Sequence, residues 1–258
     1  MKDHLQAFDR LVGIMDELRE KCPWDRKQTN ESLSHLTIEE TYELVDAIAA
    51  KDPANIKEEL GDILLHIVFY AKIAREKNEF SLAEMIHAVC DKLVIRHPHI
   101  YSDVKAEDEQ QVKQNWEKIK LKQGKKSILG GVPNSLPSIV KALRIQEKSA
   151  QVGFEWDETA QVISKVNEEI AELKDAIKSE NVNAMEDELG DVMFSLVNLS
   201  RFIKVDPEAA LQRTNKKFIS RFTAMESKIL SQGKDIMSLS LSELDALWNE
   251  AKALERNF

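Results

Sequence analysis

Two groups of four acidic residues have the types and the spacing that divalent-metal chemistry requires. In each group a Glu-x-x-Glu motif is followed by Glu-x-x-Asp, and residues three apart share one face of a helix. The members are Glu40, Glu43, Glu59 and Asp62 in the first group and Glu169, Glu172, Glu188 and Asp191 in the second. Carboxylate oxygens are the ligands that Mg²⁺ or Mn²⁺ prefers, and these ions commonly bind together with substrate phosphates. We therefore expect metal-assisted phosphate chemistry; the alternative is a solvated acidic face paired with lysines.

The two groups belong to a sequence repeat. At an offset of 129 residues, the window 39–62 aligns without a gap with 168–191, and 11 positions are identical, where about one or two would match by chance. The Gly- and Pro-rich stretch 124–138 lies between the copies. We expect residues 1–123 and 139–258 to form two helical domains joined by the linker 124–138.

Composition and capping patterns predict an all-α fold. The 258 residues include only 8 Gly and 6 Pro, with 6% aromatic and 31% charged residues, which disfavours β-sandwiches and barrels. Cap signals at Asp52-Pro53, Ser81 to Glu84, Asn183 to Glu186 and Asp206-Pro207 place helix starts. The expected helices are 3–21, 32–51, 53–77, 81–95 and 107–122 in the first half and 143–150, 158–179, 184–204, 207–232 and 241–255 in the second. Each half is expected to be a bundle with four main helices.

Short connections between helices should bring each acidic group together. Helices joined by a few residues, here near Asp52 and near Asn181, pack antiparallel. Counted from the turn, Glu43 and Glu59 then differ in height by only about 3 Å. Carboxylates in one groove repel one another and take up protons unless a multivalent cation neutralises them. The apolar run 63–70 further predicts that the helix carrying it is central and buried.

Pairs of basic residues and two tryptophans could bind a nucleotide. They are Lys92, Arg96 and Trp116 in the first half and Lys217, Arg221 and Trp248 in the second, where Asn249 follows the tryptophan. Basic residues four apart share a helix face and could clamp phosphate oxygens. An indole could stack on a base while the neighbouring amide reads its edge. The alternatives are a solvated helix face for the pairs and core packing for the tryptophans.

Charge and apolar patterning exclude several partners. The formal net charge is −9 and the basic residues are scattered, which opposes a nucleic-acid partner. The longest apolar stretch, 63–71, falls short of the ~20 residues of a spanning helix, so we expect no membrane partner. The two cysteines are too few for a disulfide framework, which favours the cytoplasm. A ferritin-like di-iron site would require Glu-x-x-His, whereas His66 stands four residues after Asp62.

With these features the sequence resembles the MazG nucleoside triphosphate pyrophosphohydrolases. Glu39-Glu40-x-x-Glu43 with Glu59-x-x-Asp62, and Glu168-Glu169-x-x-Glu172 with Glu188-x-x-Asp191, look like the paired acidic motif of that family. Segments 22–25, 96–99, 130–137, 152–157 and 215–222 look like two-domain members, so the resemblance covers essentially the whole chain. It implies tandem helical domains, usually homodimeric, that hydrolyse nucleoside triphosphates to the monophosphate and pyrophosphate with Mg²⁺.

The resemblance also implies roles for individual residues. Glu169, Glu172, Glu188 and Asp191 would hold Mg²⁺, Glu168 would be the candidate water-orienting base, Lys217 and Arg221 would grip the triphosphate, and Trp248 would contact the nucleoside. The second half is expected to be the main catalytic half, because Pro98 ends the first-half helix two residues after Arg96.

Other classes of function stay open at this point. A nucleotide-sensing adaptor would bind triphosphates without cleaving them, and a purely structural helical dimer would respond to neither metal nor nucleotide. Among enzymes, a narrow dUTPase-like or dCTPase-like activity is an alternative to a broad one. Nucleotide-pool housecleaning or regulation is the expected role.

Overall fold

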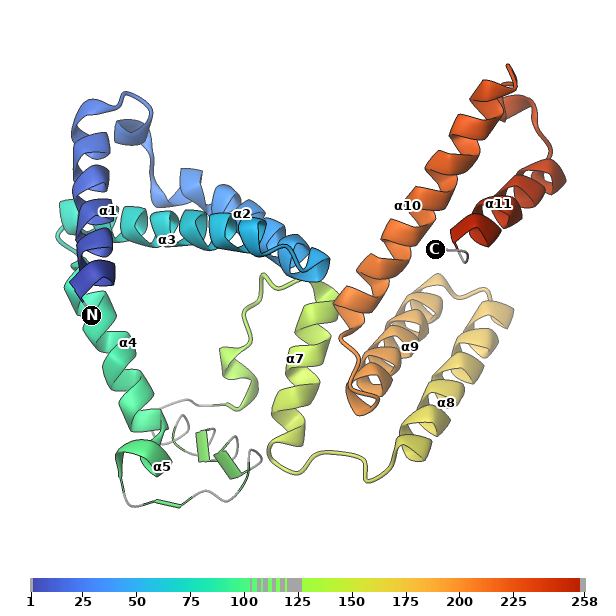
Figure 1. Cartoon of the computed structure of the whole chain (residues 1–258). Helices are drawn as coiled ribbons and strands as arrows, with labels where there is room; N and C mark the ends of the chain where they lie inside the picture. Colours follow the sequence, from blue (N-terminus) through green and yellow to red (C-terminus); the bar gives the residue numbers. More distant parts are fainter. Residues whose placement is uncertain are drawn as a thin grey trace. The chain divides into compact units, whose positions relative to one another are not determined.

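The computed structural model describes residues 2–102, 104, 105, 108, 111, 112, 115, 116, 119 and 127–255. Within these residues every regular element is a helix (Figure 1), which confirms the all-α prediction. The chain forms two compact units, residues 1–106 and 107–258. No helix in the described ranges is both long and apolar enough to cross a membrane.

The helices of the first unit are α1 (Lys2–Lys21), α2 (Asn30–Ala50), α3 (Pro53–Glu76), α4 (Leu82–Arg96) and the single turn α5 (Pro98–Tyr101). Those of the second unit are α7 (Ser138–Ala150), α8 (Thr159–Lys178), α9 (Val182–Phe202), α10 (Pro207–Ser231) and α11 (Leu241–Glu255). Three short 3₁₀ turns, Asp25–Lys27, Leu129–Gly131 and Ile236–Ser238, lie between helices. The helix expected at 107–122 falls mostly outside the described residues, and the domain boundaries at 123 and 139 stay predictions.

Side-chain caps start several of these helices where the sequence predicts. The Asp52 carboxylate accepts hydrogen bonds from the backbone N–H groups of Ala54 and Asn55, and Ser81 and Asp206 cap α4 and α10 in the same way. The expected capping box at 183–186 was wrong, because the Asn181 side chain caps α9 two residues earlier. Helix α7 also begins earlier than residue 143, directly after Pro137.

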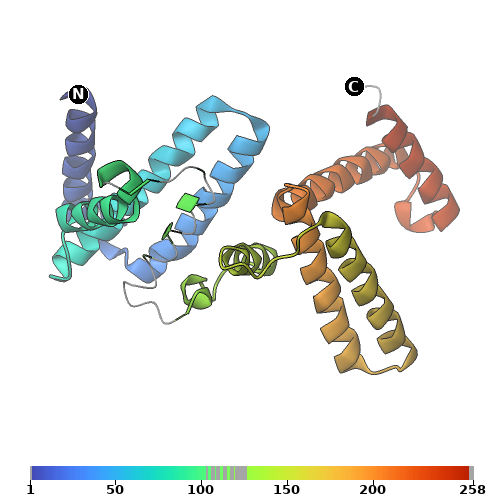
Figure 2. The ribbon, with the colours of Figure 1, turned by 90° about the horizontal axis from the view of Figure 1, so that it is seen from below.

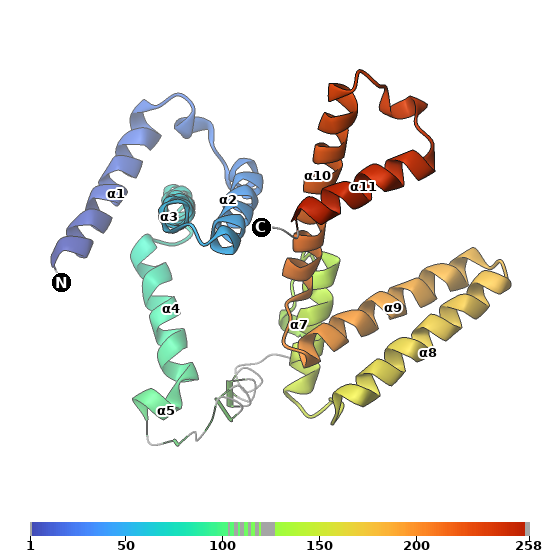
Figure 3. The same ribbon diagram turned by 45° about the vertical axis from the view of Figure 1, so that its right-hand side comes forward.

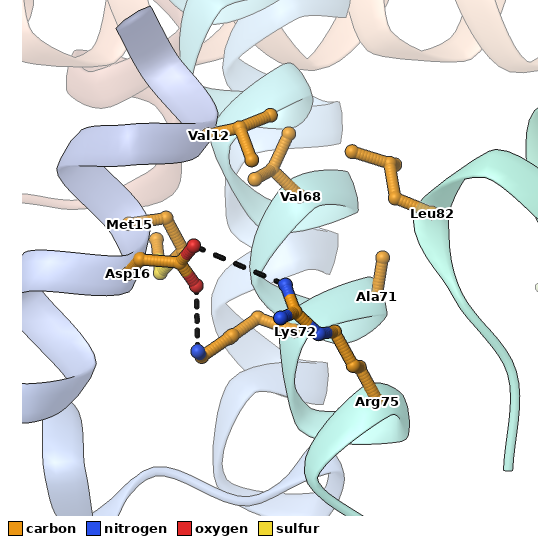
Figure 4. Close-up of a pocket in the computed structure, with 8 residues that line it drawn as sticks. All are labelled: Val12, Met15, Asp16, Val68, Ala71, Lys72, Arg75 and Leu82. Carbon is orange, nitrogen blue, oxygen red and sulfur yellow. Dashed lines mark ion pairs between the residues drawn. The ribbon is translucent and has the colours of Figure 1, made fainter. Parts of the chain in front are cut away.

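The first unit has its core where α1 crosses the C-terminal half of α3. Met15, Leu33, Val68, Phe69 and Ile73 form a buried cluster. Figure 4 shows Val12 and Met15 of α1 facing Val68 of α3, with the Asp16 carboxylate 2.5 Å from the Lys72 ammonium at the edge of this contact.

The prediction that the whole helix around 63–70 is buried was wrong for its N-terminal half. Leu60, Leu64 and Ile67 of α3 are 52%, 38% and 40% exposed. Buried side chains occur on α3 only from His66 onward. The preceding part of α3, which carries Glu59 and Asp62, therefore leaves apolar side chains exposed.

A single arginine ties α1 to the end of α3. Arg19 donates to both carboxylate oxygens of Glu76, at 3.2 and 2.6 Å, and to the carbonyl oxygens of Asp25 and Gln28. Its guanidinium also lies over the Phe69 ring. The hydrogen bonds and charge of Arg19 hold the pKa of the Glu76 carboxyl below its usual value.

Replacing Arg19 by methionine removes its hydrogen-bonded ion pair with Glu76 and is expected to lower the free energy of unfolding at pH 7. The loss should be only about 1 kcal/mol, because Glu76 is partly exposed and solvent screens the pair. The lowered pKa of Glu76 contributes stability that is present above its unfolded pKa and lost as the pH falls through its folded pKa. The gap between variant and wild type should therefore close on acidification below pH ~4. Urea titrations at several pH values measure it.

Lys21→Met is the matched control for this prediction. Lys21 pairs with Glu17 on the surface of the same helix, and both side chains are well exposed. Such pairs contribute little, so this variant should match wild type at every pH. An unfolding free energy of Arg19→Met that differs from wild type equally at pH 3 and pH 7 would contradict the assigned role of Glu76.

Candidate metal and nucleotide site

Two helical hairpins, α2–α3 and α8–α9, carry the acidic motifs. In each hairpin the helices pack side by side (Figures 1 and 2). The turns contain Lys51 and Glu180 in the left-handed backbone region, with φ of 56° and 53°, and each next helix starts at a capped residue. These tight turns bring the two motifs of each half to the same height, as the spacing predicts.

In the second half, three of the four predicted acids come together. Carboxylate oxygens of Glu169, Glu172 and Glu188 all lie within 4.8 Å of one another. Glu169 is only 6% exposed, Glu188 is half-buried and Glu172 is exposed. Asp191 is not in this group, but it lines a cavity together with Glu169.

The electrostatics of this cluster show crowding of negative charge. A hydrogen bond with the Glu169 carboxyl is the main cause that raises the pKa of Glu172, and desolvation and the charges of Glu169 and Glu188 act in the same direction. Glu172 therefore takes up a proton more readily than an isolated glutamate would.

Lys165 is a neighbour that the sequence reasoning missed. Its ammonium lies 2.8 Å from both Glu168 and Glu169, and these two hydrogen bonds raise the pKa of Lys165, so it stays charged at neutral pH. Its position four residues before Glu169 was the available signal. The candidate base Glu168 is exposed and paired with this lysine.

The first half repeats the cluster with Glu40, Glu43 and Glu59, whose carboxylate oxygens also lie within 4.8 Å of one another. Desolvation, and then the charges of Asp62 and Glu43, raise the pKa of Glu40. Desolvation and the charges of Glu43 and Glu40 likewise raise the pKa of Glu59. The charge of Asp62 therefore acts on Glu40 and Glu59, although its carboxylate is not one of the three that lie within 4.8 Å of one another.

These residues fit a divalent cation. The donors are oxygens only and come from two helices in each half. Neighbouring acidic charges are among the causes that raise the pKa values of Glu40, Glu59 and Glu172, and a cation would relieve that repulsion. Carboxylate oxygens in this number suit Mg²⁺ or Mn²⁺ better than thiophilic metals. The metal roles of the eight acids stay predictions.

The predicted triphosphate and nucleoside contacts lie on the α10–α11 pair (Figure 3). Lys217 is exposed, and the Arg221 guanidinium lies 5.8 Å from the centre of the Trp248 ring. Trp248 also packs on Phe218 with ring centroids 4.9 Å apart, and Asn249 donates to Asp245. Arg221 and Trp248 therefore come together, whereas none of these four residues lines the cavity beside Glu169.

In the first half, the matching residues are spread over α4 and beyond. Lys92 is exposed on α4, and Arg96, the last residue of that helix, is half-buried. Helix α4 ends there because Pro98 follows, and the short α5 begins at that proline, as the sequence predicts. Trp116 is half-buried, but many of the residues around it in sequence lie outside the described part. The roles of these residues stay predictions.

A cavity adjoins the second acid cluster. It has a volume of about 620 Å³ and is bordered by α7, α8, α9 and the segment 153–156. Its lining includes the charged residues Lys165, Glu169 and Asp191 and the polar or aromatic residues Gln146, Trp156 and Asn198. The sequence analysis did not find this cavity, because its wall combines residues from separate helices.

Sequence comparison relates this chain to known proteins. The model of the MazG nucleotide pyrophosphohydrolase domain matches residues 28–101 and again 158–224. The nucleoside triphosphate pyrophosphohydrolase/pyrophosphatase MazG of Thermotoga maritima is 44% identical, over 98% of both chains. The nucleoside triphosphate pyrophosphohydrolase of Escherichia coli K12 is 38% identical, over 97% of this chain and 99% of the relative.

Among solved structures, the crystal structure of a mazG-related protein from Thermotoga maritima is 28% identical, with a TM-score of 0.40, over 44% of this chain and 98% of its own. The family match covers both halves, and the two relatives match nearly from end to end. The chain therefore belongs to the MazG nucleotide pyrophosphohydrolase family and is a hydrolase.

Proposed function

We propose that this enzyme hydrolyses nucleoside triphosphates to the nucleoside monophosphate and pyrophosphate with Mg²⁺, and that the second half does most of the turnover. The observation that carries the proposal is the acid cluster, formed twice at matching positions of a chain that belongs to this family. Mn²⁺ is expected to substitute for Mg²⁺ because it accepts the same oxygen ligands.

The cluster residues would hold the cation, and the other groups would position substrate. Glu169, Glu172, Glu188 and Asp191 are the proposed ligands. Mg²⁺, when bound, supplies positive charge that offsets the charge of the triphosphate and of the reacting phosphate. Lys217 and Arg221 would bind the phosphate oxygens, with Arg in bidentate fashion.

Glu168 is the proposed base for the attacking water. In the proposed reaction the water oxygen bonds to the α-phosphorus, the bond from that phosphorus to the α–β bridging oxygen breaks, and pyrophosphate leaves. Glu168 accepts the proton of the water. The Lys165 ammonium, 2.8 Å from the Glu168 carboxylate, would hold that carboxylate in position to accept the proton.

The test is to incubate the pure protein with each common ribonucleoside and deoxyribonucleoside triphosphate, with and without Mg²⁺, and to identify the products. Monophosphate plus pyrophosphate is the expected result. Diphosphate plus phosphate would refute the cleavage position. Binding without any product would favour the nucleotide-sensing adaptor, and the breadth of substrates separates a general enzyme from a dUTPase-like or dCTPase-like one.

We also propose that the protein is a homodimer that acts in the cytoplasm on the nucleotide pool. Support for a second copy comes from apolar side chains left open along α2, where Ile38, Tyr42, Val45 and Ile48 are each more than half exposed. Light scattering should then give twice the 29.5 kDa chain mass. The two free cysteines are compatible with a reducing compartment.

A further inference from the structure

We propose that Lys165 is an internal counter-ion of the second acid cluster. Its ammonium neutralises Glu169 when no metal is bound, and it must give up that carboxylate when Mg²⁺ binds. Lys165 therefore keeps the cluster balanced in charge between turnovers and lowers the affinity of the cluster for Mg²⁺. The inference concerns the regulation of the proposed metal site and rests on the proposed function.

Lys165 of α8 lies where a cation bound to the cluster would act. Its Nζ atom is 2.8 Å from a carboxylate oxygen of Glu169 and also 2.8 Å from one of Glu168. The Glu169 side chain is only 9% exposed, whereas that of Glu168 is 56% exposed. Because a buried carboxylate without a positive partner is costly, the pairing of the ammonium matters most to Glu169, which is one of the three gathered acids.

The positive charge of Lys165 acts beyond its two direct partners. A hydrogen bond with Glu169, desolvation and the charges of Glu169 and Glu188 raise the pKa of Glu172, whereas the charge of Lys165 lowers it. Lys165 thus relieves part of the repulsion that a divalent cation would relieve. The cation and the ammonium compete for the same negative charge, and each weakens the binding of the other.

The first acid cluster has an apolar residue at the corresponding position. At the repeat offset of 129, Leu36 corresponds to Lys165, and Glu40 corresponds to Glu169. Leu36 packs against the buried core of the first unit and cannot neutralise a carboxylate. After desolvation, the causes that raise the pKa of Glu40 are the charges of neighbouring acids. The duplication therefore supplies both versions of the cluster, one with the lysine and one without it.

An ordinary ion pair on the surface of the same helix looks different. Lys178 pairs with Asp175, and their side chains are 76% and 75% exposed. Such pairs contribute little, because water and salt screen them. Lys165 instead pairs with a buried carboxylate that belongs to the proposed ligand set, so breaking this pair should change how the cluster binds a metal.

The experiment measures metal affinity without nucleotide, one cluster at a time. Mn²⁺ is the probe, because the electron paramagnetic resonance signal of free Mn²⁺ reports how much is unbound. In a chain that carries Glu43→Ala with Glu59→Ala, only the second of the two clusters stays intact. Adding Lys165→Leu, which introduces the first-half residue, should lower the Mn²⁺ dissociation constant about tenfold. Lys165→Arg keeps the positive charge and should leave the constant unchanged.

Lys178→Leu in the same chain is the matched control, since it removes one charge and one ion pair from the same helix. It should leave the Mn²⁺ dissociation constant unchanged. An affinity that Lys165→Leu leaves unchanged or weakens would overturn the counter-ion. An equal gain from Lys178→Leu, or from Lys165→Arg, would overturn it as well, because the effect would then not depend on the charge at residue 165.

Two further variants keep the proposal testable if Lys165→Leu fails to fold, as judged by circular dichroism and melting curve. Lys165→Gln retains hydrogen-bond donors toward Glu169 and should also tighten Mn²⁺ binding. In the chain that carries Glu172→Ala with Glu188→Ala, Leu36→Lys should weaken Mn²⁺ binding at the first cluster about tenfold. Leu36 is partly buried, and the aliphatic part of a lysine can cover the same apolar surface. Unchanged affinities in both variants would overturn the proposal.

The proposed function fails separately. If wild type releases no pyrophosphate from any triphosphate but Lys165→Leu tightens Mn²⁺ binding, the counter-ion stands and the proposed reaction is wrong. If pyrophosphate is released and Lys165→Leu leaves the Mn²⁺ affinity unchanged, the function stands and the counter-ion is wrong.

Discussion

Replacing Glu172 and Glu188 together by alanine is expected to abolish nucleoside triphosphate turnover, with a fall on the order of 10³-fold or more. The pair takes one carboxylate from each helix of the α8–α9 hairpin and leaves Glu169 alone in the gathered group. Of the four proposed ligands only Glu169 and Asp191 would remain, and Asp191 lies outside the gathered group, so the hydrated divalent ion should bind too weakly to support turnover. Initial rates of pyrophosphate release with saturating Mg²⁺ measure the effect.

The matched control is the same double change in the first half, Glu43→Ala with Glu59→Ala. These two residues occupy the same positions in the first cluster, so the control removes as much charge from the chain. We expect it to leave much of the activity, because Pro98 ends α4 two residues after Arg96 and the first half is therefore not expected to grip the triphosphate. Equal loss from both double variants would overturn the assignment of turnover to the second half.

Neither double change should unfold the protein. The pKa values of Glu59 and Glu172 are raised, which means that their ionised forms are disfavoured in the folded state. Removing them relieves repulsion, so the melting temperature of each variant without metal should equal or exceed that of wild type. A large drop would show that lost activity reports unfolding rather than chemistry.

Much of the fold could be predicted because its signals are local. The helix starts at Asp52, Ser81 and Asp206 depend on a capping side chain and its own next few backbone groups, and such contacts can be read from adjacent residues. The gathering of Glu169, Glu172 and Glu188 could be predicted too, because a short turn fixes the register of the two helices it joins.

The parts that could not be predicted depend on contacts between distant segments. The apolar pattern of 63–70 predicts a helix that is buried on every face. Leu64 and Ile67 are nevertheless exposed, because α1 covers only one side of α3. The cavity needs Gln146, Trp156 and Asn198 to meet from three segments. No spacing rule connects such residues, although the exchange of Phe69 for Asn198 between the two repeats was a signal that a comparison of the copies could have used.

Removing divalent cations is expected to have an effect as large as the loss of the acids themselves. With excess chelator, pyrophosphate release should fall to background, and Mg²⁺ or Mn²⁺ should restore it. Because the cation binds the folded cluster and not the unfolded chain, saturating Mg²⁺ at about 100 times its dissociation constant should stabilise wild type by about 2.7 kcal/mol. That corresponds to a rise in melting temperature of about 5 °C or more.

The pH dependence of this metal effect follows from the sign of the pKa shifts. The pKa of Glu172 is raised in the folded protein, so its contribution to metal-free stability is present below its unfolded pKa and is lost as the pH rises through the folded value. Mg²⁺ binds the ionised carboxylates, so the gain in melting temperature should grow over the same interval, from little at pH ~4 to its full size above neutrality. In the double variant Glu172→Ala with Glu188→Ala, Mg²⁺ binding at the second cluster should no longer contribute to the gain in melting temperature. If Mg²⁺ left the melting temperature of wild type unchanged at pH 8, that result would contradict a metal role for the cluster. The repulsion between the acidic side chains would then have no cation to relieve it.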